Sequence, residues 1–331
     1  MSKNMSRRAF LKGGAVLACA AATSGLPSSV KASDEEPLAT LHDLRKCIGC
    51  GECVEACSAS NQRLFPKPSK PFPKMFPKRV KAEDWSEKQD VNDRLTPYNW
   101  LTIQQADVET DAGNLTVYIP RRCMHCVNPP CVKLCPWGAA HQEKNGISVI
   151  NPDLCLGGAK CQNVCPWDIP QRQTGVGLYL DILPTYAGNG VMYKCNRCYE
   201  KVASGENPAC IDICPEGVQT IGPRKEIIAK AYEIAKEIGG YVYGDKENGG
   251  TNTIYVSPVS FEVLNEAIAK GKGLPDLSTK KDVMADGNSM TAALFLAPVA
   301  GVVGAVSRYL VTMKRINAAN ELKMDEGGHE A

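Results

Sequence analysis

Most features that would mark an enzyme or a nucleic-acid-binding protein are missing from this sequence of 331 residues. It contains no Ser/His/Asp set, no paired-carboxylate site and no phosphate-binding loop, so we expect no substrate chemistry of its own. Basic and acidic residues are nearly equal in number, 38 against 36. Five of the basic residues lie within residues 1–32, and without them the formal charge of +2 becomes −3. That balance excludes a strongly basic nucleic-acid surface.

The first 32 residues predict an export signal. Residues 6–12 read Ser-Arg-Arg-Ala-Phe-Leu-Lys, a short apolar run follows, and Val-Lys-Ala at 30–32 offers a cleavage site. The paired arginines resemble a twin-arginine signal, which the twin-arginine export machinery reads. Cys19 lies inside the apolar run, where lipidation is the alternative. Because Leu17 occupies a position that lipoprotein signals give to a small residue, we expect Cys19 to be removed with the signal.

A second apolar segment near the other end predicts a membrane anchor. Met290 to Val306 contains no charged residue, and the apolar run continues to Met313. A membrane-spanning helix needs roughly 17 to 25 largely apolar residues. We therefore expect a transmembrane helix over 288–313, with a buried core helix as the alternative. The basic residues within and after it favour a cytoplasmic tail over 314–331.

Cysteine is the abundant reactive residue: there are 16, and all except Cys19 fall into four runs. The runs are Cys47-x2-Cys50-x2-Cys53-x3-Cys57, Cys123-x2-Cys126-x4-Cys131-x3-Cys135, Cys155-x5-Cys161-x3-Cys165 and Cys195-x2-Cys198-x11-Cys210-x3-Cys214. Every run ends in Cys-x3-Cys, and three of the four continue with Pro. In bacterial ferredoxins three closely spaced cysteines hold one cubane, and the fourth ligates the other cluster of a pair. The spacing therefore predicts iron–sulfur clusters.

Three other uses of cysteine fit less well. Zinc sites use Cys-x2-Cys pairs but do not explain the repeated Cys-x3-Cys-Pro. Disulfides are plausible in an exported chain, yet 15 is an odd number. Covalent haem attachment needs His directly after a Cys-x2-Cys pair, and His125 lies inside such a pair.

The third run lacks one cysteine. If Cys155 opens a regular run, the second ligand falls at 158, where the sequence has Gly158. A glycine offers no ligand, so one corner of the cubane is left without a protein donor. This predicts a three-iron cluster. The alternative is a four-iron cluster whose open corner is held by water, hydroxide or a neighbour such as Lys160.

The four runs resemble those of the four-cluster iron–sulfur subunits of membrane-bound oxidoreductases. This family includes the beta subunits of respiratory formate dehydrogenase, nitrate reductase and dimethyl sulfoxide reductase. The likeness is greatest to the iron–sulfur subunit of hydrogenase-2-type uptake hydrogenases, whose late motifs are similar to residues 243–251 and 276–279 here. The beta subunit of formate dehydrogenase comes next.

The resemblance implies how the runs share clusters, because in this family the first run pairs with the fourth and the second with the third. Three four-iron sets and one three-iron set follow, which we number 1 to 4. Set 1 is Cys47, Cys50, Cys53 and Cys214; set 2 is Cys57, Cys195, Cys198 and Cys210; set 3 is Cys123, Cys126, Cys131 and Cys165; set 4 is Cys135, Cys155 and Cys161. The implied cofactors are three [4Fe-4S] clusters and one [3Fe-4S] cluster.

Between the cysteine runs the pattern predicts a few regular elements. Residues 98–105 and 115–120 flank an Asp-Ala-Gly-Asn turn and predict a hairpin. Residues 147–150 predict a short strand, and residues 223–238 have helical spacing that ends at a Gly-Gly pair. Trp137 and Trp167 each follow Cys-Pro, which suggests either shielding of a cluster or ordinary packing.

The expected fold is α+β: two nested twin-cluster ferredoxin-like modules with one C-terminal transmembrane helix. The expected parts are a signal (1–32), the first run with a connecting insert (33–122), the inner module (123–190), the fourth run with a C-terminal extension (191–280), the anchor (288–313) and the tail (314–331).

The resemblance implies a non-catalytic electron-transfer subunit on the periplasmic face of the cytoplasmic membrane. Its partners would be a catalytic subunit of nickel–iron hydrogenase or molybdopterin type and an integral membrane subunit that reacts with quinone. Two alternatives are the iron–sulfur subunit of another molybdopterin oxidoreductase and a free-standing redox-sensing membrane protein.

Overall fold

The computed structural model describes residues 36–72, 74–75, 81–110, 113–183, 186–187 and 189–285. The predicted export signal, the predicted transmembrane helix and the predicted tail all lie outside these ranges. Within them, no helix is both long enough and apolar enough to cross a membrane.

A four-stranded sheet joins the two ends of the described chain. Its central strand β1 (Leu38–Asp43) pairs antiparallel with β10 (Gln219–Pro223) and parallel with β12 (Thr253–Ser257), and β11 (Tyr241–Tyr243) adds an edge beside β12. The sheet thereby ties the segment before the first cysteine run to the segment after the fourth.

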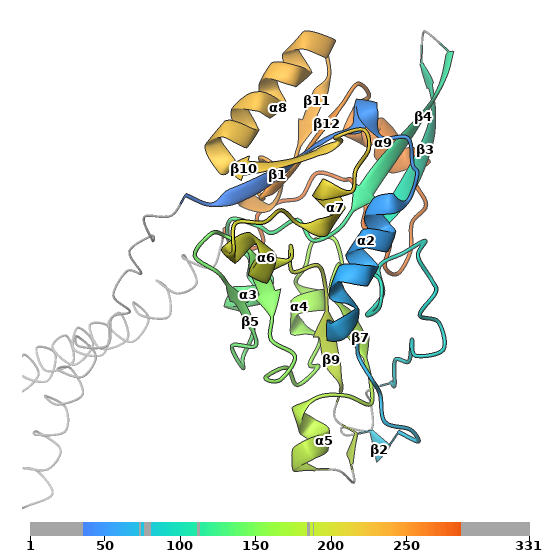
Figure 1. Ribbon diagram of the computed structural model, residues 1–331, viewed down its shortest axis with the longest axis vertical. Coiled ribbons are helices and arrows are strands. Elements are labelled where there is room, and N and C mark those ends of the chain that lie inside the picture. Colours follow the sequence, from blue (N-terminus) through green and yellow to red (C-terminus); the bar gives the residue numbers. More distant parts are fainter. Residues whose placement is uncertain are drawn as a thin grey trace, which may run out of the picture. The chain divides into compact units, whose positions relative to one another are not determined.

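Helix α8 (Arg224–Ile238) covers one face of this sheet (Figure 1). It buries Ile227 and Ala231 against Leu41 and Ile254, because residues four apart lie on one side of a helix. Gly239 ends it at a φ of +61°, which glycine adopts without strain. The helix predicted over 223–238 is confirmed.

The longest strands form a hairpin, β3 (Thr102–Thr110) with β4 (Gly113–Arg121), paired antiparallel along their whole length. Helix α9 (Phe261–Ala267) packs against β3. The predicted hairpin is confirmed, but it begins at residue 102 rather than 98. Residues 96–99 form a tight turn instead, in which the backbone N–H of Asn99 donates to the hydroxyl of Thr96 at 2.9 Å.

Short helices contain or follow cysteines of each run. They are α2 (Glu52–Asn61), α3 (Pro130–Lys133), α4 (Lys160–Asn163), α6 (Tyr199–Ala203) and α7 (Ala209–Asp212). Helix α2 of the first run packs against α7 of the fourth, and α3 of the second run packs against α4 of the third. The first run therefore contacts the fourth, and the second contacts the third.

Small antiparallel pairs connect the runs. Strand β5 (Ala140–Gln142) pairs with β6 (Ser148–Ile150), and β7 (Gln171–Gln173) pairs with β9 (Val191–Tyr193). Strand β6 confirms the strand predicted over 147–150. The remaining elements are β2 (Lys74–Met75), paired with β8 (Tyr186–Ala187), helix α5 (Leu178–Ile182), and the 3-10 turns Leu44–Lys46, Gln62–Leu64 and Glu247–Gly249.

The cysteines are part of the interior, since most of them belong to the same buried cluster as Leu101, Ile119 and Tyr255. The observed mixture of short helices and small sheets is the expected α+β class. The four-stranded sheet and the β3–β4 hairpin lie beside the short helices that contain the cysteines (Figure 1).

Candidate iron–sulfur centres

One cavity is lined by cysteines from opposite ends of the chain. Those cysteines are Cys47, Cys50, Cys53 and Cys214, the members of set 1. Ile103, Pro120 and Pro215 complete its apolar wall. Of the 15 described cysteines, Cys50 is the exposed one.

A second cavity is lined by Cys123, Cys126, Cys131 and Cys165, the members of set 3. Pro130, Pro166 and Ile169 contribute apolar surface, and Ser148 and Lys194 contribute polar groups. The structure therefore places the cysteines of sets 1 and 3 around two separate, largely apolar hollows.

Electrostatic neighbours show how the other cysteines gather. Burial raises the pKa of Cys57, and nearby thiolates raise it further; these belong to Cys195, Cys210 and Cys198, the rest of set 2. Burial raises the pKa of Cys161 as well, and the nearby thiolates there are those of Cys155, Cys131, Cys135 and Cys165. Set 4 therefore lies together and borders set 3.

The same electrostatic neighbours give the four sets an order, which we call the line of cysteine sets. Burial and the neighbouring thiolate of Cys210 raise the pKa of Cys53 to about 12, which joins set 1 to set 2. The thiolate of Cys123 lies near Cys195 and joins set 2 to set 3. Sets 3 and 4 meet at Cys131 and Cys161. The line runs from set 1 to set 4.

These sites fit clusters better than single ions. Among the described residues, no group of three or more Cys, His, Asp or Glu side chains closes around a point as one metal ion requires. A cubane stands between its thiolates and keeps them further apart. Burial raises the pKa of Cys195 to about 11, so a thiolate there needs nearby positive charge, which the iron of a cluster supplies.

A buried arginine contacts one of the cysteines directly. Arg122 is 1% exposed, and its Nη1 donates to the Sγ of Cys210 at 2.9 Å. Its Nη2 donates to Thr40 Oγ1 at 2.9 Å and lies 3.1 Å from the Nε2 of His42. Because burial and Arg122 lower the pKa of His42, that imidazole stays neutral beside the guanidinium.

Two further cations lie between sets 2 and 3. Lys194 donates through Nζ to the carbonyl oxygens of Ser148 and Cys195. Arg197 donates to Leu38 O and Asn252 O, both at 2.8 Å. Burial, assisted by Arg122, lowers the pKa of Arg197 to about 9, which still leaves it charged at neutral pH.

Sequence reasoning missed Arg122, Lys194 and Arg197. A signal was present, because Arg122 and Lys194 each precede a cysteine directly and Arg197 lies between two of them.

Backbone N–H groups also point at the thiols. Arg197 N lies 3.3 Å from Cys195 Sγ, and Met192 N lies 3.5 Å from Cys155 Sγ. Such donors favour the thiolate and tune a bound cluster. The amide of Arg197 lies in the turn between Cys195 and Cys198, whereas that of Met192 belongs to strand β9.

Gly158 lies in open space. A Cβ built on it meets no atom within 4 Å, and the residue is exposed. Its neighbour Gly157 differs, because its φ is +60° and a Cβ there would lie 2.3 Å from the carbonyl oxygen of Gly190. The loop therefore needs glycine at 157 but has room for a side chain at 158.

The two tryptophans have different surroundings. Trp167 is 3% exposed, lines the set 3 cavity and donates through Nε1 to the hydroxyl of Tyr243 at 2.8 Å. Trp137 is 63% exposed. The packing alternative for Trp137 is therefore wrong, and the shielding of a cluster stays a prediction.

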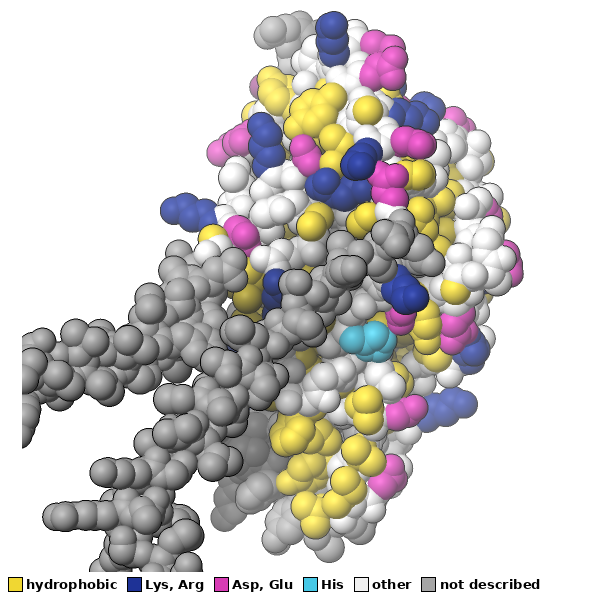
Figure 2. Space-filling model, turned by 90° about the vertical axis from the view of Figure 1, so that its left-hand side faces the viewer, with side chains coloured by type: hydrophobic (Ala, Val, Ile, Leu, Met, Phe, Trp, Pro, Cys, Tyr) yellow, Lys and Arg dark blue, Asp and Glu magenta, His cyan; other side chains and the backbone are white. Residues whose placement is uncertain are grey.

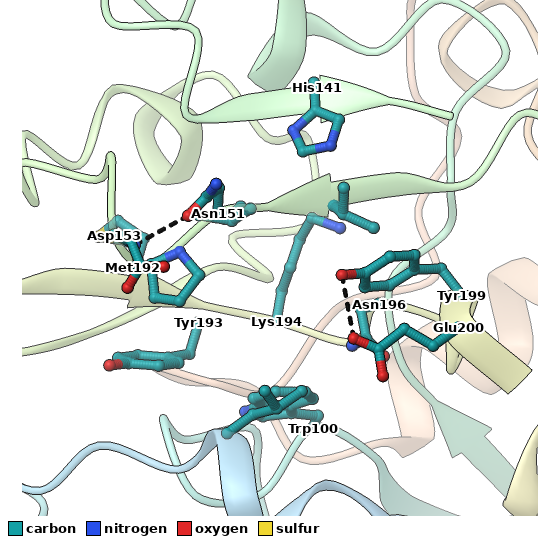
Figure 3. A pocket seen from close by; sticks show the side chains of 14 residues that line it. Trp100, His141, Asn151, Asp153, Met192, Tyr193, Lys194, Asn196, Tyr199 and Glu200 are labelled. Carbon is teal, nitrogen blue, oxygen red and sulfur yellow. Dashed lines mark hydrogen bonds between the residues drawn. The ribbon is translucent and has the colours of Figure 1, made fainter. Parts of the chain in front are cut away.

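A surface cavity of about 350 Å³ lies beside the middle of the line (Figure 3). Trp100 and Tyr193 stand at one side of it and His141 at the other, with Lys194 between them. Asn196, from the turn between Cys195 and Cys198, also lines it. Lys194 lines both this surface cavity and the cavity of set 3, so its side chain lies between the molecular surface and the cysteines of that set.

Comparison with known proteins gives consistent matches. Two family profiles, each described as a 4Fe-4S dicluster domain, match residues 46–139 and 115–224. The hydrogenase-2 operon protein HybA of Shigella flexneri is 30% identical over 317 residues, covering 83% of this chain and 86% of that protein.

Two other relatives belong to different enzymes. The formate dehydrogenase-O iron-sulfur subunit of Shigella flexneri is 30% identical, covering 71% of this chain and 72% of that subunit. A subunit of the anaerobic dimethyl sulfoxide reductase of Haemophilus influenzae is 35% identical, covering 57% of this chain and 75% of that subunit.

The sharing of α2 between two sets can be tested with two cysteines one turn apart. Cys53→Ala should abolish the electron paramagnetic resonance (EPR) signal of set 1, because Cys53 lines the set 1 cavity. Cys57→Ala should abolish that of set 2, because Cys57 lies near Cys195 and Cys198. Cys198→Ala is the matched variant, because Cys198 belongs to set 2 together with Cys57 and its loss should abolish the same signal. If the C57A and C198A variants lost different signals, the assignment of Cys57 would be wrong.

Proposed function

Because this protein is a member of the family of iron–sulfur electron-transfer subunits of oxidoreductase complexes, we propose that it conducts electrons between a catalytic subunit and a membrane subunit that reacts with quinone. The observation that carries the proposal is the line of four cysteine sets, in which each set borders the next. Iron–sulfur clusters held there would supply one-electron redox chemistry. The protein's own residues fix the spacing, exclude water and donate hydrogen bonds to the thiolates.

We propose three [4Fe-4S] clusters at sets 1, 2 and 3 and one [3Fe-4S] cluster at set 4. The first three sets each offer four cysteines, and two of them line shared cavities. Set 4 offers Cys135, Cys155 and Cys161 only. Lys160 is exposed at the edge of that loop, and Gly158 supplies no donor atom.

Exposed apolar side chains at both ends of the line support contacts with two partners. Near set 1, Ile48 is 58% exposed and Ile213 is 45% exposed. Near set 4, Trp137 and Leu154 are similarly exposed. Figure 2 shows basic and acidic side chains interspersed over one face of the molecule, with hydrophobic side chains gathered toward its lower part. Such a surface suits protein partners rather than nucleic acid.

The catalytic partner in this proposal is of nickel–iron hydrogenase or formate dehydrogenase type. The relatives named for hydrogenase-2 and formate dehydrogenase-O support this choice equally by identity, and HybA does so over more of the sequence. Another molybdopterin oxidoreductase is the second candidate, favoured by the likeness to the dimethyl sulfoxide reductase subunit.

We further propose export by the twin-arginine route and attachment to the periplasmic face of the cytoplasmic membrane. The support is the sequence of residues 6–12 and the uncharged run from Met290 to Val306. Export of a folded protein suits a chain that must acquire its clusters first.

Iron and acid-labile sulfide analysis of the anaerobically purified protein tests the central proposal. We expect one iron for each of the 15 cysteines, together with a three-iron EPR signal in the oxidised state. Zinc without labile sulfide would overturn the proposal. A sixteenth iron without the three-iron signal would overturn only the assignment at Gly158.

Gly158→Cys should convert set 4 to a four-iron cluster, because the new Cβ meets no atom within 4 Å. The three-iron signal should disappear and the iron content should rise by one per chain. Gly157→Cys is the matched control, since it adds the same thiol one residue earlier, where the Cβ collides with Gly190. It should lower stability without the conversion. Retention of the three-iron signal in G158C would contradict the register.

Fractionation of cells tests the localisation. The full-length protein should be found in the membrane fraction and be digested by protease added to spheroplasts. A chain ending at residue 287 should appear in the periplasm, and Arg7→Lys with Arg8→Lys should keep it in the cytoplasm. Full-length protein recovered from the soluble cytoplasm would contradict this part of the proposal.

A further inference from the structure

The buried cations are unevenly distributed along the line of cysteine sets. Arg122 lies close to Cys210, Cys195 and Cys57 of set 2. Lys194 lies close to Cys123 and Cys131 of set 3, and to Cys195 of set 2. Arg122 also acts on Cys53 of set 1, less strongly than the thiolates of Cys210 and Cys47 do, but its hydrogen bond goes to Cys210 of set 2. Lys194 lines the cavity of set 3. The buried cations in direct contact with a cysteine or a cysteine cavity therefore lie at the inner sets.

These cations are held away from water. Arg122 is 1% and Lys194 is 6% exposed. Lys194 precedes Cys195 directly, and its Nζ donates to the carbonyl oxygens of Ser148 and Cys195 at the wall of the set 3 cavity.

Set 3 has a further donor without a partner. The hydroxyl of Ser148 is buried, accepts and donates no hydrogen bond among the described residues, and lines the set 3 cavity together with Lys194. A buried hydroxyl without a partner is costly, and a group bound in the cavity would satisfy it. A cluster sulfide or a cysteine sulfur would accept that hydrogen bond.

We infer that Lys194 and Ser148 raise the reduction potential of the cluster at set 3, and that Arg122 does the same at set 2, so that electrons reside at the two inner sets before they occupy set 1. This inference rests on the proposed four-cluster function. Reduction adds one negative charge to a cluster, and a cation buried beside it stabilises that charge more than a solvated cation would. Hydrogen bonds to the ligating sulfurs act in the same direction.

The inner sets together can hold two electrons, one at each cluster. A catalytic partner that releases electrons in pairs can then pass both electrons to the inner sets before either electron leaves this protein. In this role Lys194, Ser148 and Arg122 are positioning residues, since they act through the clusters and not on a substrate.

The effect of the Lys194 charge can be tested with a substitution that keeps a long side chain at this position. Lys194→Met removes the charge and keeps an unbranched stem on the wall of the cavity in Figure 3. In an EPR-monitored redox titration of the full-length protein, the ratio of reduced to oxidised cluster at set 3 should fall at least about tenfold at a fixed potential, or 59 mV for a one-electron couple. Lys194→Arg should restore most of the ratio, because it keeps the positive charge.

Lys201→Met is the matched control. Lys201 follows Cys198 by three residues, but its side chain is 42% exposed and pairs with Glu206 at 3.2 Å. Because water screens its charge, the same titration should show less than about a twofold change at any set.

Ser148→Ala gives a second, milder measurement in case Lys194→Met fails to load its cluster. It removes one unpartnered hydroxyl and leaves the carbonyl that Lys194 uses. The set 3 ratio should fall about threefold while the other sets are unchanged. Fully loaded variants with unaltered ratios would overturn the inference and leave the proposed function intact. Absence of clusters from the unaltered protein would overturn both.

Discussion

The fold depends on burying many potential anions in one interior. Most of the cysteines lie in the same core as aliphatic and aromatic side chains, and burial raises the pKa of thiols such as Cys53 and Cys165 to about 12. A thiolate in that environment is stable only beside positive charge. Iron can provide most of it, and Arg122, Lys194 and Arg197 provide the rest from within the protein. The same interior therefore has to pack the cysteine side chains and to balance the charge of their thiolates.

The fold brings the two ends of the described chain together in one sheet. Strand β1 lies between β10 and β12, so the segments before the first run and after the fourth are hydrogen-bonded side by side. Helix α2 is thereby fixed against α7. Of its two cysteines, one turn apart, Cys53 lines the set 1 cavity, whereas Cys57 lies near Cys195 and Cys198. Cys47 and Cys214, far apart in sequence, line one cavity because the sheet pairs the segments next to them.

The four cysteine sets were predicted from spacing and family likeness, and the cysteines of sets 1 and 3 line one cavity each. The periodicity of residues 223–238 was enough to predict α8. The cations were not predictable in this way. Arg122 and Lys194 precede cysteines, but so do Lys46 and Lys160, which are exposed. The same two-residue pattern therefore gives opposite burial, because the neighbouring element and not the local sequence decides it. Trp137 and Trp167 show the same limit: each follows Cys-Pro, and only Trp167 meets a partner, Tyr243.

The exposure of Cys50 makes the two ends of the line unequal in durability. Oxidants and chelators reach a sulfur at the surface before they reach one enclosed by protein, and cysteine oxidation follows exposure. The set that contains Cys50 is then the first to be damaged when the protein is separated from whatever covers that end. In the proposed complex, a partner bound at that end would protect the cluster as well as exchange electrons with it, so assembly would set the working lifetime of the molecule in air.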